Sequence, residues 1–136
     1  MAKTKASWRQ KMATDNGLPR TMVIPAPREV DAVMKTAKRG RVLTINDIRQ
    51  VLARQHQVDM CCPMTTGIFA WIAAHAAAEA QAEGEKRVTP WWRTVKTGGE
   101  LNPKYPGGVE TQARLLRAEG RTIVKRGKRW FVEGVE

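Results

Sequence analysis

The stretch that most constrains the fold begins at Pro63 and ends in the alanine-rich run Ala73–Ala80. Proline suits the first turn of a helix because its missing N–H would be unpaired there. Alanine is the strongest helix former, so the sequence predicts one long helix over this stretch. Four of its larger residues fall along one helical face, and we expect that face, with Trp71, to belong to the core: Ile68, Trp71, Ile72 and His75.

Two shorter helices are predicted before it. The first begins at Pro27 and runs to about Lys38, with an inward face at helical spacing formed by Val30, Val33, Met34 and Ala37. The second opens at Thr44, followed three residues later by Asp47, which resembles a capping box, and ends near His56. Its buried face is expected to contain Ile45, Ile48, Val51 and Leu52.

The second and third predicted helices form a helix-turn-helix-like pair. In such pairs the N-terminal residues of the second helix face a nucleic-acid groove. Here these residues are Thr65, Thr66 and Gly67, which are short and uncharged. Their hydroxyls and backbone N–H groups can contact phosphate, but they are poor readers of bases.

The C-terminal part predicts one more helix and a hairpin. The helix spans Val109–Glu119, and Gly120 is placed as its C-terminal cap. Residues 122–132 are β-branched and aromatic around a strongly basic Arg-Gly turn, which predicts two short strands. We therefore expect a mainly α fold with a small β-hairpin, a winged helix-turn-helix-like domain over residues 22–136. Residues 1–21 are predicted to be a basic, flexible N-terminal arm.

The charge of the chain restricts its partners. A net charge of +11 and a pI near 10.4 on 136 residues favour a polyanion. Double-stranded DNA is the first candidate, with an anionic membrane surface or a ribosome as alternatives. No run of about 18 apolar residues is present, so no segment is expected to span a bilayer. The first 20 residues lack an apolar region, so we expect no secretory signal and a cytoplasmic location.

Catalytic and metal-binding patterns are scarce. Cys61 and Cys62 are neighbours and cannot form a disulfide framework, and with His56 and His75 they match no zinc spacing. We expect no metal and no cofactor. No nucleophile with a partner base stands out. Cys62 precedes the long helix and is the one thiol that its position could activate, although buried, inert cysteines are the favoured interpretation.

The segment Thr89-Pro90-Trp91-Trp92-Arg93 carries two of the five tryptophans on a basic background. If it is extended, the two indoles point to opposite sides, one into the core and one outward. An outward indole could stack on a base, an interaction worth roughly 1–3 kcal/mol. The alternative is that both rings fill the space beneath the helix that begins at Val109.

The order of several motifs resembles the DNA-binding domain of the O6-alkylguanine-DNA alkyltransferase family and its alkyltransferase-like relatives. The motifs are Gly40-Arg41-Val42-Leu43-Thr44, Pro90-Trp91-Trp92-Arg93-Thr94-Val95, Gly98-Gly99-Glu100-Leu101, Tyr105-Pro106-Gly107-Gly108 and Leu115-Leu116-Arg117-Ala118-Glu119-Gly120. In the family, a Pro-Cys-His-Arg motif supplies the alkyl-accepting cysteine and a histidine that relays its proton to a glutamate.

Departures from the family pattern remove this chemistry. Trp91 stands at the cysteine position, as in alkyltransferase-like proteins, and Trp92 stands at the histidine position. Glu119 matches the relay glutamate, and Tyr105 matches a residue that lines the base pocket. Thr66 aligns with the arginine that replaces the flipped base, and Ile45 with the tyrosine that rotates the phosphate.

Together, residues and resemblance predict a monomeric, non-catalytic protein that binds double-stranded DNA and senses alkylated or damaged bases, with other repair proteins as further partners. The expected phosphate contacts are Thr65, Thr66, Arg93, Lys96, Arg126 and Lys128, and the expected base pocket is Trp91, Trp92 and Tyr105. Two alternatives stay open. One is a diverged methylated-DNA-protein cysteine methyltransferase that uses Cys61 or Cys62, and the other is a basic nucleic-acid or ribosome-associated adaptor.

Overall fold

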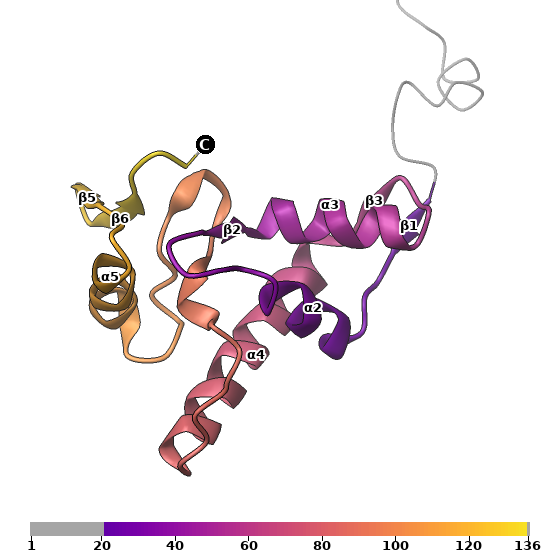
Figure 1. The fold of residues 1–136 in the computed structure, drawn as a ribbon. Coiled ribbons are helices and arrows are strands. Elements are labelled where there is room, and N and C mark those ends of the chain that lie inside the picture. The colour runs from indigo at the N-terminus through magenta and orange to yellow at the C-terminus, as the bar shows by residue number, and fades with distance from the viewer. Residues whose placement is uncertain (1–20, 136) are drawn as a thin grey trace, which may run out of the picture.

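The computed structural model of the chain describes residues 21–135. Within this range the fold is mainly helical, with helices α2 (Pro27–Met34), α3 (Ile45–Gln55), α4 (Pro63–Ala82) and α5 (Gly108–Ala118) and a small hairpin (Figure 1). The predicted fold class, mainly α with a β-hairpin, is confirmed. The predicted arm, residues 1–21, lies outside the described residues except for Thr21. No helix in the described part is long and apolar enough to cross a membrane.

Helix α3 begins as its sequence predicts. The Asp47 backbone N–H donates to the Thr44 hydroxyl oxygen over 3.1 Å, and the Thr44 N–H donates to the Asp47 carboxylate over 2.9 Å. This reciprocal pair is a capping box with aspartate in place of glutamate. The helix ends at Gln55, with His56 as the C-terminal cap.

Helix α2 is about one turn shorter than expected. It starts at Pro27 but ends at Met34 instead of Lys38. The Thr36 hydroxyl then donates to the Val33 carbonyl over 2.6 Å, and at Gly40 the backbone turns with a φ of 80°. The chain leaves the helix here because residues 37 to 40 bond to distant parts of the protein, as described below.

Helix α4 turns a face of small residues to the core and exposes several of its large ones. The side facing α2 and α3 consists of Thr66, Ala70, Ala73, Ala74 and Ala77, all buried. These short side chains allow neighbouring helices to approach closely. Trp71 lies on the other side, with 42% of its surface exposed, so the expectation that it belongs to the core is wrong.

Residues 90–108 run between α2, α3 and α4 on one side and α5 with the hairpin on the other (Figure 1). Two cores meet at this segment, and each includes residues from it. The first lies among α2, α3 and α4 and contains Met34, Ile48 and Leu52, which are fully buried. The second lies between α5 and the hairpin and contains Leu101, Leu116 and Val132. Trp92 packs against both, so the Pro-Trp-Trp-Arg segment joins the two cores.

Two pairs of short strands connect segments that lie between the helices. β1 (Met22–Val23) pairs in parallel with β3 (Met60–Cys61), and β2 (Leu43–Thr44) pairs in parallel with β4 (Thr94–Val95). The β2–β4 pair places the tryptophan segment beside the start of α3. These pairings span long sequence separations that local patterns do not reveal.

The hairpin consists of β5 (Ile123–Arg126) and β6 (Arg129–Val132), which are antiparallel, with Lys125 opposite Trp130. The turn between them contains Gly127 with a φ of 65°. The Leu101 N–H donates to the Trp130 carbonyl over 2.9 Å, which attaches the hairpin to residues 100–101. The predicted hairpin is therefore present and packs on α5 and on the segment that precedes it.

Candidate nucleic-acid interface

The Pro-Trp-Trp-Arg segment is a single 3₁₀ turn over Trp91–Arg93, so the extended conformation considered from its sequence is not the one it adopts. The Arg93 N–H donates to the Pro90 carbonyl over 3.1 Å and closes the turn. Its two indoles therefore meet edge to face, with ring centres 5.9 Å apart and planes at 86°.

Three aromatic rings fill the space expected for a base pocket. Trp91 is 3% exposed and packs edge to face on Tyr105 as well, with ring centres 6.1 Å apart. Tyr105 is also 3% exposed, and its burial raises the pKa of the phenol far above its usual range. Trp92 is half-buried and is the one ring of the three that solvent reaches. The sequence left open whether Trp91 and Trp92 leave an open pocket or fill the space, and in the structure Trp91 and Tyr105 are buried and packed together.

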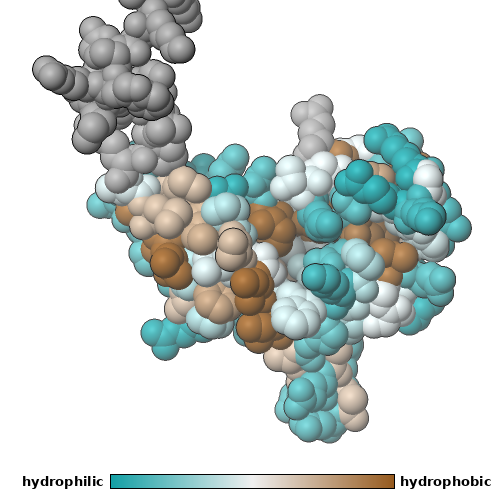
Figure 2. All heavy atoms as spheres, turned by 180° about the vertical axis from the view of Figure 1, so that it is seen from behind, coloured by the Kyte–Doolittle hydropathy of each residue, from teal (hydrophilic) through white to brown (hydrophobic). Residues whose placement is uncertain are grey.

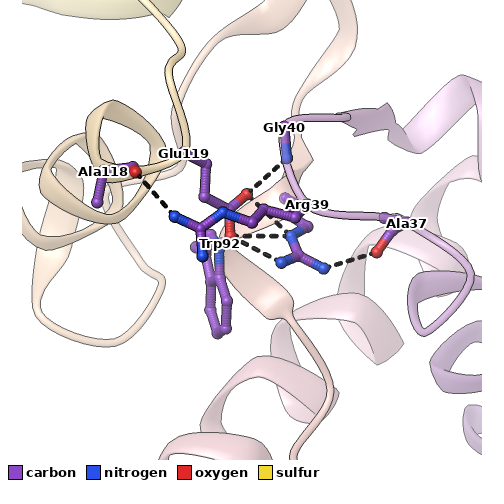
Figure 3. A network of polar contacts seen from close by, with 7 residues as sticks. Ala37, Arg39, Gly40, Trp92, Ala118 and Glu119 are labelled. Atoms are coloured by element: carbon purple, nitrogen blue, oxygen red, sulfur yellow. Dashed lines mark hydrogen bonds and ion pairs between the residues drawn. The ribbon is translucent and has the colours of Figure 1, made fainter.

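Glu119 accepts hydrogen bonds from two separate segments, the Trp91–Arg93 turn and Gly40 (Figure 3). The Arg93 guanidinium forms a two-pronged ion pair with it, with Nη2 2.7 Å from Oε2 and Nε 2.9 Å from Oε1. The Trp92 indole N–H donates to Oε2 over 2.9 Å, and the Gly40 backbone N–H donates to Oε1 over 3.1 Å. Arg93 also donates to the Ala37 carbonyl over 2.8 Å.

The surroundings of Glu119 favour its charged form. The side chains of Glu119 and Arg93 are 8% and 15% exposed. Burial alone would raise the pKa of the Glu119 carboxyl, but the hydrogen bonds from Arg93, Trp92 and Gly40 outweigh it and hold the pKa below its usual value. The carboxylate that the resemblance assigns to proton relay thus ties the end of α5 to the tryptophan segment and to residues 37–40.

Three of the predicted phosphate contacts have their donors engaged or covered inside the protein. Arg93 is paired with Glu119 and Ala37, as described. Thr66 is fully buried, and its hydroxyl donates to the Cys62 carbonyl over 2.6 Å. The Thr65 hydroxyl is buried as well, beside the Cys62 thiol. These residues build the interior, and we exclude them from the candidate surface.

The remaining predicted contacts are exposed cations on or beside the hairpin, together with two that the sequence interpretation did not single out. We call the whole set the cationic strip: Lys96, Lys125, Arg126, Lys128 and Arg129. Lys125 lies on the Trp130 face of the hairpin, and Arg126 and Arg129 lie on the Phe131 face. Lys96 and Arg129 both approach the same carboxylate oxygen of Glu100, at 3.7 and 2.6 Å. Arg129, followed by Lys96, holds the pKa of that carboxyl below its usual range. Lys96 therefore adjoins the hairpin, although the two are far apart in sequence.

Aromatic rings position the hairpin cations. The Lys125 ammonium lies 4.3 Å from the centre of the Trp130 ring, and Arg117 reaches the same ring at 5.9 Å. Arg126 and Arg129 lie 5.2 and 5.3 Å from the centre of Phe131. Such contacts restrict the long side chains. The pairing of Lys125 with Trp130 across the strands was the sequence signal for this arrangement, because a hairpin places them opposite each other.

A groove of about 750 Å³ lies between α4 and residues 96–104. We call it the α4 groove. Its helical side comprises Ile45, Met64, Gly67, Ile68 and Trp71, and its other side comprises Lys96, Thr97, Asn102, Pro103 and Lys104. The Trp71 indole N–H donates to the Lys104 carbonyl over 2.9 Å, and His75 contacts the same oxygen at 2.8 Å. These two bonds attach α4 to the loop that forms the opposite side of the groove.

The two cysteines differ. Cys61 is buried, and its sulfur lies 3.2 Å from the Thr66 hydroxyl. Cys62 is partly exposed at the N-terminal cap of α4, where the nearby side chain and N–H of Thr65 hold the pKa of its thiol below the usual value. Among residues 21–135, no three histidine, cysteine or acidic side chains are grouped as a metal site would require.

Comparison with known proteins yields one structural likeness. No protein-family model and no curated protein matches the chain. The chain is similar to S. pombe Atl1, whose crystal structure is a complex with damaged DNA containing O6-carboxymethylguanine. The two share 18% identity over 78% of this chain and 85% of that one, with a TM-score of 0.48. A likeness of this extent carries no conclusion about function.

Proposed function

We propose that the protein is a non-catalytic, double-stranded-DNA-binding protein that contacts the phosphate backbone through the cationic strip. The observation that carries this proposal is the arrangement of the hairpin cations. Within residues 21–135, Lys125, Arg126 and Lys128 form no ion pair with an acid, and the first two lie against aromatic rings. Their charge is therefore available to an anionic partner, and their side chains lose less freedom on binding.

DNA suits this strip because its phosphates form a regular anionic row. Each phosphate neutralised by a lysine or arginine releases condensed counterions, so binding weakens with salt by a slope of about 0.9 per contact. The net charge of +11 adds a long-range attraction of the same sign. This binding mode requires no base contacts, in agreement with the lack of an accessible base-reading residue at the start of α4.

A salt titration tests the proposal. Fluorescence polarisation of a labelled duplex is measured from about 50 mM salt upward for the wild type and for Lys125→Ala/Arg126→Ala/Lys128→Ala. We expect the triple variant to lose affinity and to reduce the salt slope by about 2 to 3. The matched control is Arg28→Ala/Lys86→Ala/Arg87→Ala, which removes the same charge from exposed positions elsewhere. Equal losses in both variants, or no duplex binding by the wild type at low salt, would overturn the proposal.

Recognition of alkylated bases is a finer proposal that rests on the motif order. Because Trp91 and Tyr105 are packed together, a modified base that approaches this site would meet Trp92 first. Affinities for otherwise identical duplexes with O6-methylguanine or guanine test this idea. A preference for the modified duplex that Trp92→Leu abolishes supports it, and equal affinity contradicts it.

Alkyl transfer to Cys62 is the second candidate function, because this thiol has a lowered pKa at a helix start. In such a transfer, the Cys62 thiolate would attack the O6-methyl carbon, the carbon–oxygen bond would break, and the guanine would take up a proton. Mass spectrometry after incubation with an O6-methylguanine duplex would find one added methyl group on the peptide containing Cys62. An unmodified peptide after complete incubation excludes this function.

A further inference from the structure

Helix α4 has an unusual composition for a helix at a DNA surface. In a chain with 24 lysines and arginines, its 20 residues include neither, and its one charged residue is Glu79, near its C-terminal end. Helices that enter a DNA groove present cations or hydrogen-bonding side chains to it. The exposed N-terminal half of α4 presents neither, which separates it chemically from the cationic strip.

Large apolar side chains occupy this exposed half instead. Met64 is 73% exposed, Ile68 44% and Trp71 42%. Their spacing of four and three residues puts them along one face of the helix, and all three line the α4 groove. Figure 2 shows apolar residues gathered in the middle of this side of the molecule, next to the hydrophilic region that carries the hairpin. Contiguous apolar surface of this kind marks interaction sites.

The opposite side of the groove supplies positive charge. Lys96 and Lys104 line it, and both side chains are exposed. None of the ten residues that line the groove is acidic. An occupant that satisfies both sides therefore carries apolar residues for α4 and carboxylates for the lysines.

We propose that the α4 groove docks an acidic amphipathic helix of a partner protein. In helix-in-groove recognition, apolar residues spaced at i, i+3 or i+4, and i+7 enter a hydrophobic groove, while the polar face stays at the rim. Met64, Ile68 and Trp71 form the apolar side, and Lys96 and Lys104 attract the carboxylates. The groove adjoins the cationic strip at Lys96, which belongs to both. The protein would then join nucleic acid on one surface to a protein on the neighbouring surface, which is an adaptor arrangement.

Charge excludes two other occupants. A second copy of this chain carries a net charge of +11 and is repelled by the groove lysines. The N-terminal residues carry Lys3, Lys5, Arg9, Lys11 and Arg20 against Asp15 and have the same sign. The remaining alternative is DNA, with the apolar side chains of α4 inserted as wedges between its bases. The variants described below distinguish this alternative from a protein partner.

The first measurement uses defined peptides of about 18 residues, long enough for five helical turns. The acidic peptide has leucines at i, i+4, i+7 and i+11 and glutamates at most other positions. A second peptide replaces every glutamate with lysine, and a third scrambles the leucines. By fluorescence polarisation we expect the acidic amphipathic peptide to bind about tenfold or more tightly than either control. If the scrambled acidic peptide binds as tightly as the amphipathic one, charge alone accounts for the binding and the proposal is overturned.

Two variants locate the site. Met64→Gln/Ile68→Gln keeps good helix formers at exposed positions and is expected to weaken the acidic peptide by about tenfold. Ile72→Gln is the matched control, because Ile72 is 46% exposed on the same helix but lines a different hollow, against α2. We expect it to bind the peptide like the wild type. Lys104→Glu, which leaves α4 unchanged, is expected to shift preference from the acidic to the basic peptide.

The same variants separate this inference from the proposed DNA binding. Met64→Gln/Ile68→Gln should bind the duplex like the wild type, while the hairpin triple variant should keep most of its peptide affinity. If Met64→Gln/Ile68→Gln instead loses duplex affinity and not peptide affinity, the groove is a DNA surface and the inference fails. If the wild type binds no duplex but the peptide results hold, the DNA proposal alone fails.

Discussion

Trp71 and Trp91 lie in two aromatic sites that differ in their exposure to solvent. Trp91 sits in the motif that attracts attention in the sequence, yet it is 3% exposed and surrounded by rings. Trp71 sits in an alanine-rich helix whose sequence predicts a core position for it, yet it is 42% exposed in the α4 groove. The neighbours of each ring account for the difference. Glu119 and Tyr105 hold one site closed, and the alanines of α4 take the core position that Trp71 would otherwise occupy.

Truncating each tryptophan is the strongest test of this contrast. Trp91→Ala should lower the free energy of unfolding by about 3–5 kcal/mol, because it opens a cavity in the first core. Trp71→Ala should lower it by less, about 1–2 kcal/mol, because 42% of the residue is already exposed and its loss removes one hydrogen bond to Lys104. Urea unfolding of both variants gives the two values. Similar destabilisation by both would show that Trp71 also belongs to the core.

Local signals in the sequence predicted much of the fold. The Thr44–Asp47 capping box placed the start of α3, and Pro63 placed the start of α4. Gly120 and Gly127 marked the end of α5 and the hairpin turn, where the backbone needs a positive φ. These features depend on neighbours within a few residues, so the sequence alone can reveal them.

The candidate site was harder to predict because it depends on long-range contacts. The sequence predicted Arg93 as a phosphate contact, but in the structure it is paired with Glu119, which lies 26 residues away in the chain. Residues 35–38 continue the apolar periodicity of α2, but Gly40 bonds to Glu119, 79 residues away, and the chain has already left the helix. In α4, periodicity identified a face with large residues that includes Trp71, but the face with small residues is the one that packs in the core. Which of the two faces is buried depends on the neighbouring helices, and the sequence of α4 alone does not show this.

Enlarging one alanine on each face of α4 tests whether small residues determine which face is buried. Ala74 is fully buried against the first core, so Ala74→Leu should destabilise the protein by about 1–3 kcal/mol through overpacking. Ala76 lies two positions along the helix and is exposed, so Ala76→Leu should stay within about 0.5 kcal/mol of the wild type. Thermal or urea unfolding compares the two. A tolerated leucine at position 74 would mean that the core has room for large residues and that another cause exposes Trp71.

Removing the charge of Glu119 tests what keeps Trp91 and its neighbouring rings packed together. Glu119→Gln keeps the shape but loses the ion pair with Arg93, which should lower the free energy of unfolding by about 2 kcal/mol at neutral pH. Glu133→Gln, at an exposed carboxylate, is the control with the same charge change and should have little effect.

The pH dependence of that difference identifies the carboxylate as its source. The pKa of Glu119 is lower in the folded protein than its ordinary value of 4.5, so its contribution is present above about that pH and is lost as the pH falls through the folded value. The wild type should therefore approach the stability of Glu119→Gln as the pH drops below 4.5. Glu29 and Glu100 also have lowered pKa values, but they titrate in both proteins and cancel in the difference. A difference that does not change with pH would mean that Glu119 acts through its shape and hydrogen bonds, and that charge does not keep this aromatic site closed.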